Sequence, residues 1–345
     1  MTQDLFLSKS CPVYGQGFHN SAGAFTESWL QFVQPVIAGL WPRLFKPAPI
    51  VILDAYFGLG YNTWVFLWAL EALKSLGFTL KAPLLLYAAD LNATPEVWRM
   101  ILSQTAWHKA SVIDQTTAYL LRMAEDLEKQ FPECTHRDST ILNSAGRFSL
   151  NAISHTLEHN TYYQTLEAEK PGSSVSFVTE DGRVRFEFFK GDARETFKRL
   201  NCEGIKVHAQ FFDAFSPKVV PMLWTFGQMA CLRDLLHPEG LWVSYCSANA
   251  VRGALRQAGF TVLESKPLGG KQRGGTVALM PAAQGALDTL TRLDIASQLT
   301  QAQHEQLNGP GGVPYESQNW MESPEVILER RKVAQKAQAS IKKHI

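Results

Sequence analysis

The stretch Pro49-Ile-Val-Ile-Leu-Asp54, followed closely by Phe57-Gly-Leu-Gly60, is the first of several apolar runs that end in an acid. A short apolar run bounded by proline and glycine predicts a buried strand and then a turn. Residues 62–77 carry apolar side chains at helical spacing and end at a glycine, which predicts a helix. The opening unit is therefore strand, glycine turn and helix.

The same unit recurs along the chain. Further strands are expected at residues 83–90, 183–190, 206–212 and 241–245, and helices at 97–106, 195–200, 221–236 and 249–258. His237-Pro-Glu-Gly240 predicts a turn between helix and strand. Two last strands, 260–265 and 276–280, have no helix between them and predict an antiparallel hairpin at one edge. The alternation predicts an α/β fold with a mostly parallel sheet and helices on both faces.

Three segments lie outside this pattern. Residues 1–45 form a lead-in, and 46–282 form the main domain, with an insertion at about 107–182 that is expected to be helical. Residues 283–345 are expected to form a helical extension, with a flexible break at Asn308-Gly-Pro-Gly-Gly312 and a basic tail.

Composition narrows the class of protein. With 46% hydrophobic and 19% charged residues, the 345-residue chain has ample material for a core. No apolar stretch is long enough to span a membrane and no apolar signal segment follows Met1, so we expect a cytoplasmic protein without a membrane partner. Five scattered cysteines without a Cys-x-x-Cys pair argue against a disulfide framework or zinc knuckle. A net charge of +1 means that a nucleic-acid partner would need a local basic patch.

Acids end the predicted strands. Because the carboxyl ends of parallel strands share one edge of the sheet, Asp54, Asp90 and Asp213 are expected to converge on one crevice. The turn before Gly60 is not a dinucleotide fingerprint, since Thr63 stands where its last glycine is needed, and no phosphate-loop lysine follows. A nucleoside held by acids without phosphate recognition favours S-adenosylmethionine over NAD. Each motif alone is also compatible with a plain turn or a capping acid.

The segment Asp213-Ala-Phe-Ser-Pro217 follows the fourth strand, where reacting groups would meet. Asp213 is placed to accept a hydrogen bond from a substrate amine and to help position or pass its proton. Phe215 and Pro217 are placed to shield the site from water. These residues make Asp213 the candidate catalytic residue.

Taken together, these motifs resemble the methyltransferase domain of the MnmC-type tRNA wobble-uridine enzymes, in a free-standing form without the flavin oxidase domain. The resemblance covers roughly residues 10–282. It rests on an ordered set of pieces, which are Ala24-Phe-Thr-Glu27-Ser28, Leu53-Asp-Ala-Tyr-Phe-Gly-Leu-Gly-Tyr-Asn62, Asp90, Phe189-Lys-Gly-Asp192-Ala, Phe211-Phe-Asp-Ala-Phe-Ser-Pro-Lys218, Pro238-Glu-Gly240 and Gly269-Gly-Lys-Gln-Arg273. The chain departs from the family's glycine turn at Tyr56, where the family usually has another glycine, and in its longer insertion.

The resemblance implies a class I methyltransferase fold, S-adenosylmethionine as donor, and the primary amine of 5-aminomethyl(-2-thio)uridine in tRNA as acceptor. A separate enzyme would supply that aminomethyl intermediate. Gly58, Gly60 and Asn62 would line the methionine end of the donor, Asp90 would hold the ribose and Asp192 the adenine, with Asp54, Leu91, Ala193 and Asp213 completing the donor site. The substrate side would consist of Glu27, Phe215, Pro217, Lys218, Lys271 and Arg273.

Other readings stay open. Methyl or aminopropyl transfer to a small amine would need no basic patch, whereas a non-catalytic RNA-binding scaffold would have lost donor affinity through Tyr56. Positive residues gather between Val251 and Thr276 and again from Glu329 onward, where they can bind RNA phosphates or simply be solvated. His155-Thr-Leu-Glu-His159 has a metal-binding spacing but no evident third ligand, so we expect a solvated helical pair and no metal.

Overall fold

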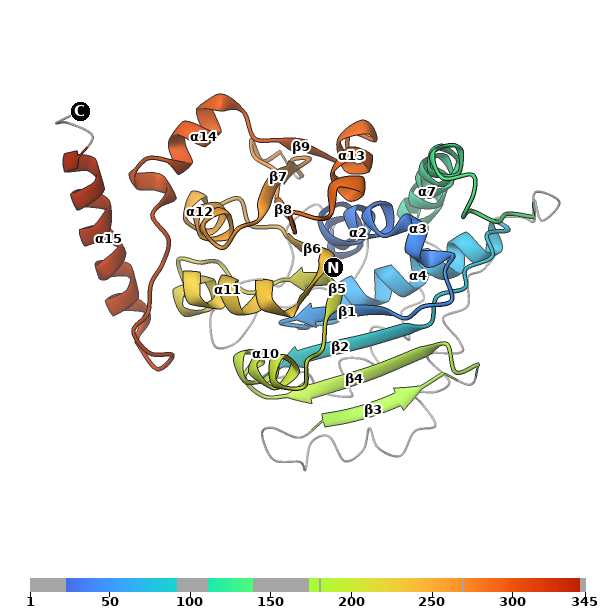
Figure 1. Cartoon of the computed structure of the whole chain (residues 1–345), viewed down its shortest axis with the longest axis horizontal. Coiled ribbons are helices and arrows are strands. Elements are labelled where there is room, and N and C mark those ends of the chain that lie inside the picture. The colour runs from blue at the N-terminus through green and yellow to red at the C-terminus, as the bar shows by residue number, and fades with distance from the viewer. Residues whose placement is uncertain (1–22, 92–110, 139–173, 180, 269, 342–345) are drawn as a thin grey trace.

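The computed structural model describes residues 23–91, 111–138, 174–179, 181–268 and 270–341. The helix expected at 97–106 and the pair His155 and His159 lie outside these residues. The described strands form one nine-stranded sheet in the order β3-β4-β2-β1-β5-β6-β8-β7-β9 (Figure 1). The parallel centre of the sheet consists of β4 (Val184–Lys190), β2 (Leu84–Asp90), β1 (Ile50–Ala55), β5 (Val207–Phe212) and β6 (Leu236–Ser244).

Antiparallel strands complete both ends of the sheet. The predicted hairpin is β7 (Thr261–Ser265) with β8 (Thr276–Leu279), and β8 pairs with β6. The outermost strands are β9 (Ala296–Gln298) beside β7 and β3 (Ser174–Val178) beside β4. Neither outer strand was predicted, and β3 shows that the insertion is not wholly helical. The mostly parallel α/β sheet with an antiparallel C-terminal hairpin is confirmed.

Helices cover both faces of the sheet and divide the core in two (Figure 1). One face carries α1 (Ala24–Ser28), the π-helix η1 (Trp29–Val33), α2 (Gln34–Gly39), α3 (Trp41–Leu44), α4 (Tyr61–Ser75), α7 (Ser111–Gln130) and α13 (Gln284–Arg292). The other carries α10 (Ala193–Cys202), η2 (Pro221–Trp224), α11 (Phe226–Leu235), α12 (Asn249–Gln257), α14 (Gln301–Leu307), η3 (Pro310–Gly312) and α15 (Pro324–Ile341). Within the described residues, no helix is both long and apolar enough to cross a membrane.

The structure corrects two boundaries. The helix expected at 221–236 is split at Thr225, whose extended backbone and side chain cap α11 by accepting a hydrogen bond from the Gln228 N–H. A bridge from Thr225 to Tyr315 of the C-terminal segment holds this break in place. The turn expected at His237 to Gly240 instead belongs to β6, where the register against β5 shifts between Val207 and Ala209.

The C-terminal extension packs on α12 through close backbone contact. Gly253 of α12 faces Gly312 of η3, since a Cβ on Gly253 would lie 2.0 Å from the Gly312 carbonyl oxygen, and a Cβ on Gly312 would lie 2.0 Å from the Leu307 carbonyl oxygen. Arg331 of α15 secures the same segment by donating to the Val313 and Gly311 carbonyls at 2.7 and 3.0 Å. The expected glycine break is thus a packed turn.

We predict that Gly253→Ala lowers the free energy of unfolding by about 1–3 kcal/mol, because the methyl group must displace the Gly312 backbone. Gly227→Ala is the matched control, since Gly227 also lies in a helix but has nothing within 4 Å of its Cβ position. Urea unfolding measures both variants. Equal stabilities for the two would contradict this close contact.

Candidate active site

The acids that end the parallel strands meet at one edge of the sheet. In register, Ala55 of β1 lies opposite Ala89 of β2 and Phe212 of β5, so Asp54, Asp90 and Asp213 end neighbouring strands. Their charges interact, because Asp213 and Asp90 both raise the pKa of Asp54. The convergence predicted from the sequence is therefore present.

The turn between β1 and α4 depends on its glycines. Gly58 and Gly60 have φ angles of 55° and 76°, in the left-handed region that favours glycine. A Cβ on Gly60 would lie 2.4 Å from the Phe57 ring. The Gly58 N–H donates to Asp90 Oδ2 at 2.8 Å, so the turn is fixed to the end of β2. Asp90 is half-buried, whereas Leu91 after it is exposed.

Asp54 lies buried against the start of α4, with only 1% of its surface exposed. Its Oδ2 accepts hydrogen bonds from the Thr63 hydroxyl at 2.6 Å and the Thr63 N–H at 3.2 Å. Burial is the largest cause that raises its pKa well above the usual value. Asp54 Oδ1 and Asn62 Oδ1 are buried acceptors without a hydrogen-bond partner among the described residues.

These acceptors fit the donor implied by the sequence. Carboxylate and amide oxygens suit the ammonium and hydroxyl donors of an S-adenosylmethionine molecule, and buried acceptors left without partners call for an explanation. The residues present therefore fit S-adenosylmethionine, with Asp54 and Asn62 at its ammonium end.

Tyr56 adopts the backbone conformation of the glycine that it replaces, with a φ angle of 64°. Its ring packs edge-on against Phe212 of β5 and Phe197 of α10, at centroid distances of 5.0 and 6.1 Å. Its hydroxyl is buried without a hydrogen-bond partner among the described residues, and burial raises its pKa well above the usual value. The ring thus belongs to the core on the α10 face.

Asp192 and Ala193 begin α10, as predicted, but Asp192 is already engaged. Its Oδ1 caps the helix by accepting from the Arg194 N–H at 2.9 Å, and its Oδ2 accepts from Arg194 Nη2 at 2.6 Å. Burial alone would raise the pKa of Asp192, but the bonds from Arg194 outweigh it and lower that pKa. Arg194 also donates to the Trp320 carbonyl at 2.8 Å and lies over the Trp320 ring. An adenine amine would share Asp192 with Arg194.

Asp213 directly follows β5, at the same edge of the sheet as Asp54 and Asp90. It is half-buried, and Asn62 Nδ2 donates to its Oδ2 at 2.9 Å. Burial raises the pKa of Asp213 to about 7, and the nearby carboxylate of Glu27 adds to the rise. Glu27 on α1 is 7% exposed, so the lead-in segment places a largely buried acid near Asp213.

The loop after Asp213 shapes the substrate side. The Phe215 carbonyl accepts a hydrogen bond from Trp224 Nε1 at 2.8 Å, which anchors the loop to η2. Pro217 is buried, whereas Lys218 is exposed. Phe215 is half-buried, which is compatible with the expectation that this loop shields the site from water.

Tyr245 is a site residue that the sequence reasoning missed. Its hydroxyl donates to the Ala214 carbonyl at 2.8 Å, next to Asp213. Burial raises its pKa well above the usual value, and the charges of Cys246, Asp213 and Glu27 contribute. Lys271 Nζ lies 5.8 Å from its ring centroid, which joins the basic loop to the acidic crevice. Its place at the carboxyl end of a predicted strand was the available signal.

Comparisons with known proteins agree with this geometry. A family model described as S-adenosyl-L-methionine-dependent methyltransferase matches residues 155–281. The crystal structure of MnmC2 from Aquifex aeolicus is similar at a TM-score of 0.62 and 23% sequence identity, covering 96% of this chain and 82% of that one. These comparisons confirm the methyltransferase fold and S-adenosylmethionine as the cofactor, and the likeness to MnmC2 is one of fold.

We predict that Asp213→Asn stabilises the protein at pH 8 by roughly 1–4 kcal/mol and has little effect near pH 4. The folded protein keeps the Asp213 proton up to its pKa of about 7, whereas the unfolded chain loses it near pH 4. Wild-type stability therefore falls as the pH rises through this window, and the variant lacks that fall.

Urea unfolding across pH 4–8 measures the effect. Asp234→Asn is the matched control, because the Asp234 side chain is 65% exposed. A difference between Asp213→Asn and wild type that stays constant with pH would contradict a protonated buried carboxyl group.

Proposed function

We propose that this S-adenosylmethionine-dependent methyltransferase methylates the primary amine of 5-aminomethyl(-2-thio)uridine at the tRNA wobble position, giving 5-methylaminomethyl(-2-thio)uridine. The observation that carries the proposal is the pairing of Asp213 with Glu27 and Asn62 at the end of the donor turn. Two carboxylates close enough to interact suit a cationic amine. The similarity to MnmC2 supports the same acceptor.

On the donor side of the site, acidic side chains would hold S-adenosylmethionine by accepting hydrogen bonds from it. When bound, S-adenosylmethionine supplies a methyl group on a positively charged sulfonium. The free Oδ1 atoms of Asp54 and Asn62 accept from its ammonium group, and Asp90 accepts from the ribose hydroxyls. Gly58 and Gly60 give the turn at the methionine end its left-handed backbone conformation. Asp192 accepts from the adenine amine beside Arg194, with Ala193 and Leu91 next to these acids along the chain.

On the acceptor side, the site must take a proton from the substrate amine. An alkylammonium has a pKa near ~10 and must lose a proton before its nitrogen can attack. Ionised Asp213 accepts that proton, and its pKa of about 7 suits a base that works near neutral pH. With S-adenosylmethionine bound, the N–C bond would form as the C–S bond of the sulfonium broke, leaving a neutral thioether, and Asp213 would pass the proton to solvent. Phe215 and Pro217 limit the access of water.

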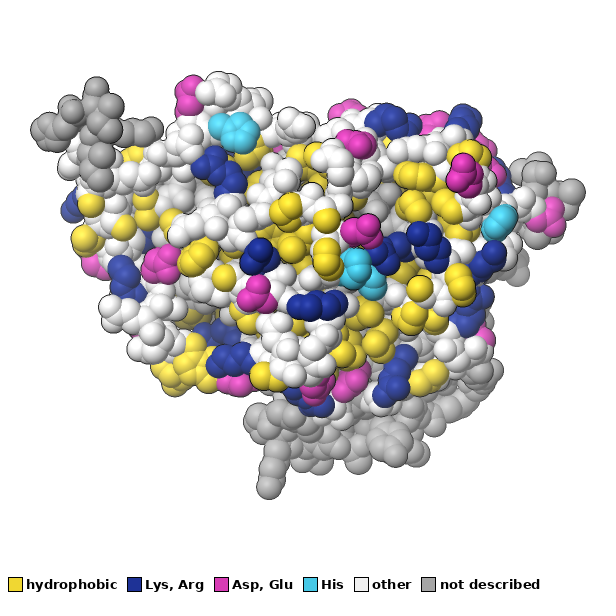
Figure 2. All heavy atoms as spheres, in the orientation of Figure 1, with side chains coloured by type: hydrophobic (Ala, Val, Ile, Leu, Met, Phe, Trp, Pro, Cys, Tyr) yellow, Lys and Arg dark blue, Asp and Glu magenta, His cyan; other side chains and the backbone are white. Residues whose placement is uncertain are grey.

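A tRNA substrate fits the local distribution of charge. On the face drawn in Figure 2, Lys and Arg side chains are interspersed with Asp and Glu, in keeping with the net charge of +1. RNA contact is then carried by local groups, among them Lys218, Lys271 and Arg273. A cytoplasmic tRNA and a separate enzyme that makes the aminomethyl group complete the proposal.

Methyl transfer from labelled S-adenosylmethionine tests the proposal. The acceptors are tRNA carrying 5-aminomethyluridine and, as the control, the same tRNA without the modification. Label only in the modified tRNA is the expected result. Donor binding without transfer would point to a small amine as acceptor, and absence of donor binding would favour a non-catalytic scaffold. Either result would overturn the proposal.

Two substitutions separate donor binding from catalysis. Asp213→Ala is expected to lower kcat by at least about 100-fold while donor affinity stays largely intact, because the acceptor proton loses its base. Asp90→Ala is expected to weaken donor affinity, because it removes the ribose acceptor and releases the Gly58 N–H. Equilibrium titration with the donor and single-turnover rates measure the two effects. Wild-type turnover by Asp213→Ala would show that Asp213 has another role.

A further inference from the structure

Arg252 of α12 is a fully buried cation, with 0% of its surface exposed. Its Nη2 donates to Glu264 Oε1 at 3.1 Å and to the Gly274 and Gly275 carbonyls at 3.1 and 2.9 Å. Its Nε donates to Thr276 Oγ1 at 3.0 Å. The third nitrogen, Nη1, has no hydrogen-bond partner among the described residues.

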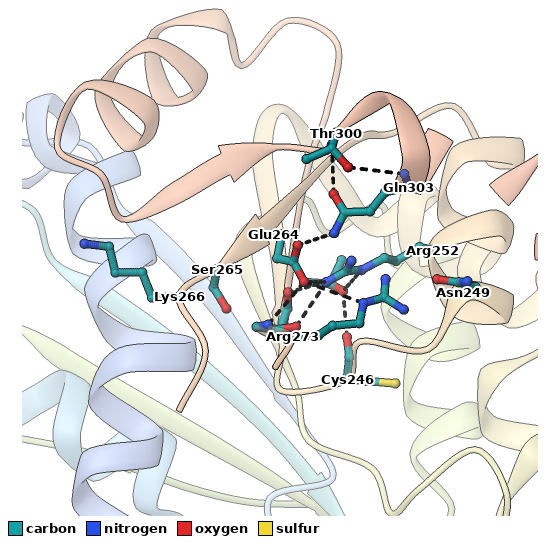
Figure 3. A network of polar contacts seen from close by, with 12 residues as sticks. Cys246, Asn249, Arg252, Glu264, Ser265, Lys266, Arg273, Thr300 and Gln303 are labelled. Carbon is teal, nitrogen blue, oxygen red and sulfur yellow. Dashed lines mark hydrogen bonds and ion pairs between the residues drawn. The ribbon is translucent and has the colours of Figure 1, made fainter. Parts of the chain in front are cut away.

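A second guanidinium lies beside it. Arg273 Nε is 3.8 Å from the same Glu264 oxygen, and its Nε and Nη2 are buried without hydrogen-bond partners in the described chain. In Figure 3 its guanidinium extends past that of Arg252 toward Asn249, the first residue of α12. Glu264 Oε2 is occupied by Gln303. The single Glu264 carboxylate therefore pairs with two arginines, so one positive charge of the cluster is not neutralised.

The neighbouring thiol does not supply the missing negative charge. Burial raises the pKa of Cys246 to about 11, although Arg252, Lys271 and Arg273 each act to lower it. The thiol is thus neutral at physiological pH, and three cations surround it. Buried guanidinium N–H groups without acceptors are rare in proteins and indicate an absent ion or water. The Arg273 side chain is 34% exposed, so solvent can reach this cluster.

The loop that carries Arg273 is rigidly attached at its end. Gln31 Oε1 accepts from the Gly275 N–H at 3.0 Å and from the Ser265 hydroxyl at 2.7 Å. Gly274 and Gly275 tolerate no side chain, since a Cβ would lie 1.5 Å from the Ser265 carbonyl oxygen and 2.3 Å from Gln31 Oε1, respectively. The cations are therefore held in place before any ligand arrives, which reduces the entropic cost of binding.

We propose that Arg252 and Arg273, with Lys271 beside them, form a binding site for a backbone phosphate of the RNA substrate. A planar guanidinium donates two parallel hydrogen bonds to a phosphate, which suits the free N–H groups here. Lys271 contacts Tyr245, and Tyr245 contacts the residue after Asp213, so the site adjoins the reacting position. The inference rests on the proposed function, and the phosphate would belong to a nucleotide near the target base.

Equilibrium binding of tRNA, measured by fluorescence anisotropy at several salt concentrations, tests the site. Arg273→Gln is expected to weaken tRNA binding about tenfold and to reduce the slope of log K against log salt by about 1. Arg256→Gln removes the same charge one turn further along α12, where Arg256 bonds to Asn308, and is expected to bind tRNA like wild type. Circular dichroism melting verifies that both variants are folded.

The possible outcomes distinguish this inference from the proposed function. Wild-type affinity and salt slope in Arg273→Gln would overturn the phosphate site even if the enzyme methylates tRNA. Loss of donor affinity in Arg273→Gln, with tRNA binding retained, would instead assign the cations to the donor carboxylate and also overturn it. The expected loss of tRNA binding in Arg273→Gln supports the site whether or not wild type transfers a methyl group.

Discussion

The clustering of carboxylates at one edge of a parallel sheet, with Asp54 buried and Asp90 and Asp213 half-buried, is the constraint on which the rest of this structure depends. Parallel strands β1, β2 and β5 end side by side, so Asp54, Asp90 and Asp213 lie close together in a region of low dielectric. Like charges in such a place disfavour one another's ionisation. The surrounding helices and turns are arranged to offset that cost: Thr63 at the start of α4 bonds Asp54, Gly58 bonds Asp90 and Asn62 bonds Asp213.

The part of this electrostatic cost that the hydrogen bonds do not offset has a consequence for function. A ligand that carries ammonium and sulfonium charges would offset this cost, and it would meet oxygens of Asp54 and Asn62 that have no hydrogen-bond partner among the described residues. Burial, together with the nearby carboxylate of Glu27, raises the pKa of Asp213 into the range of a useful base. On the other side of Tyr245 the local charge is positive, because Arg252 and Arg273 share the single carboxylate of Glu264. A cationic donor and a polyanionic acceptor would thus each meet charge of the opposite sign.

Features set by local pattern could be predicted from the sequence, and those set by tertiary contact could not. Asp54, Asp90 and Asp213 follow apolar runs of strand length, so both their strands and their convergence were predictable. Thr225 interrupts a helix because of Tyr315, ninety residues later in the chain, and β9 pairs through only three residues. Arg194 donates a hydrogen bond to Asp192, and Arg252 is fully buried. Both features likewise follow from packing, which the spacing of apolar residues in the sequence does not reveal.

Proton release on donor binding tests the central claim most directly. Calorimetric titrations with S-adenosylmethionine at pH 7, in two buffers of different ionisation enthalpy, measure the protons released. Because Asp213 has a pKa of about 7, a cationic donor beside it should release up to about half a proton per molecule bound in wild type. Asp213→Asn should bind the donor without that release. Equal proton release by both proteins, or none by either, would contradict a buried, partly protonated Asp213 beside the donor.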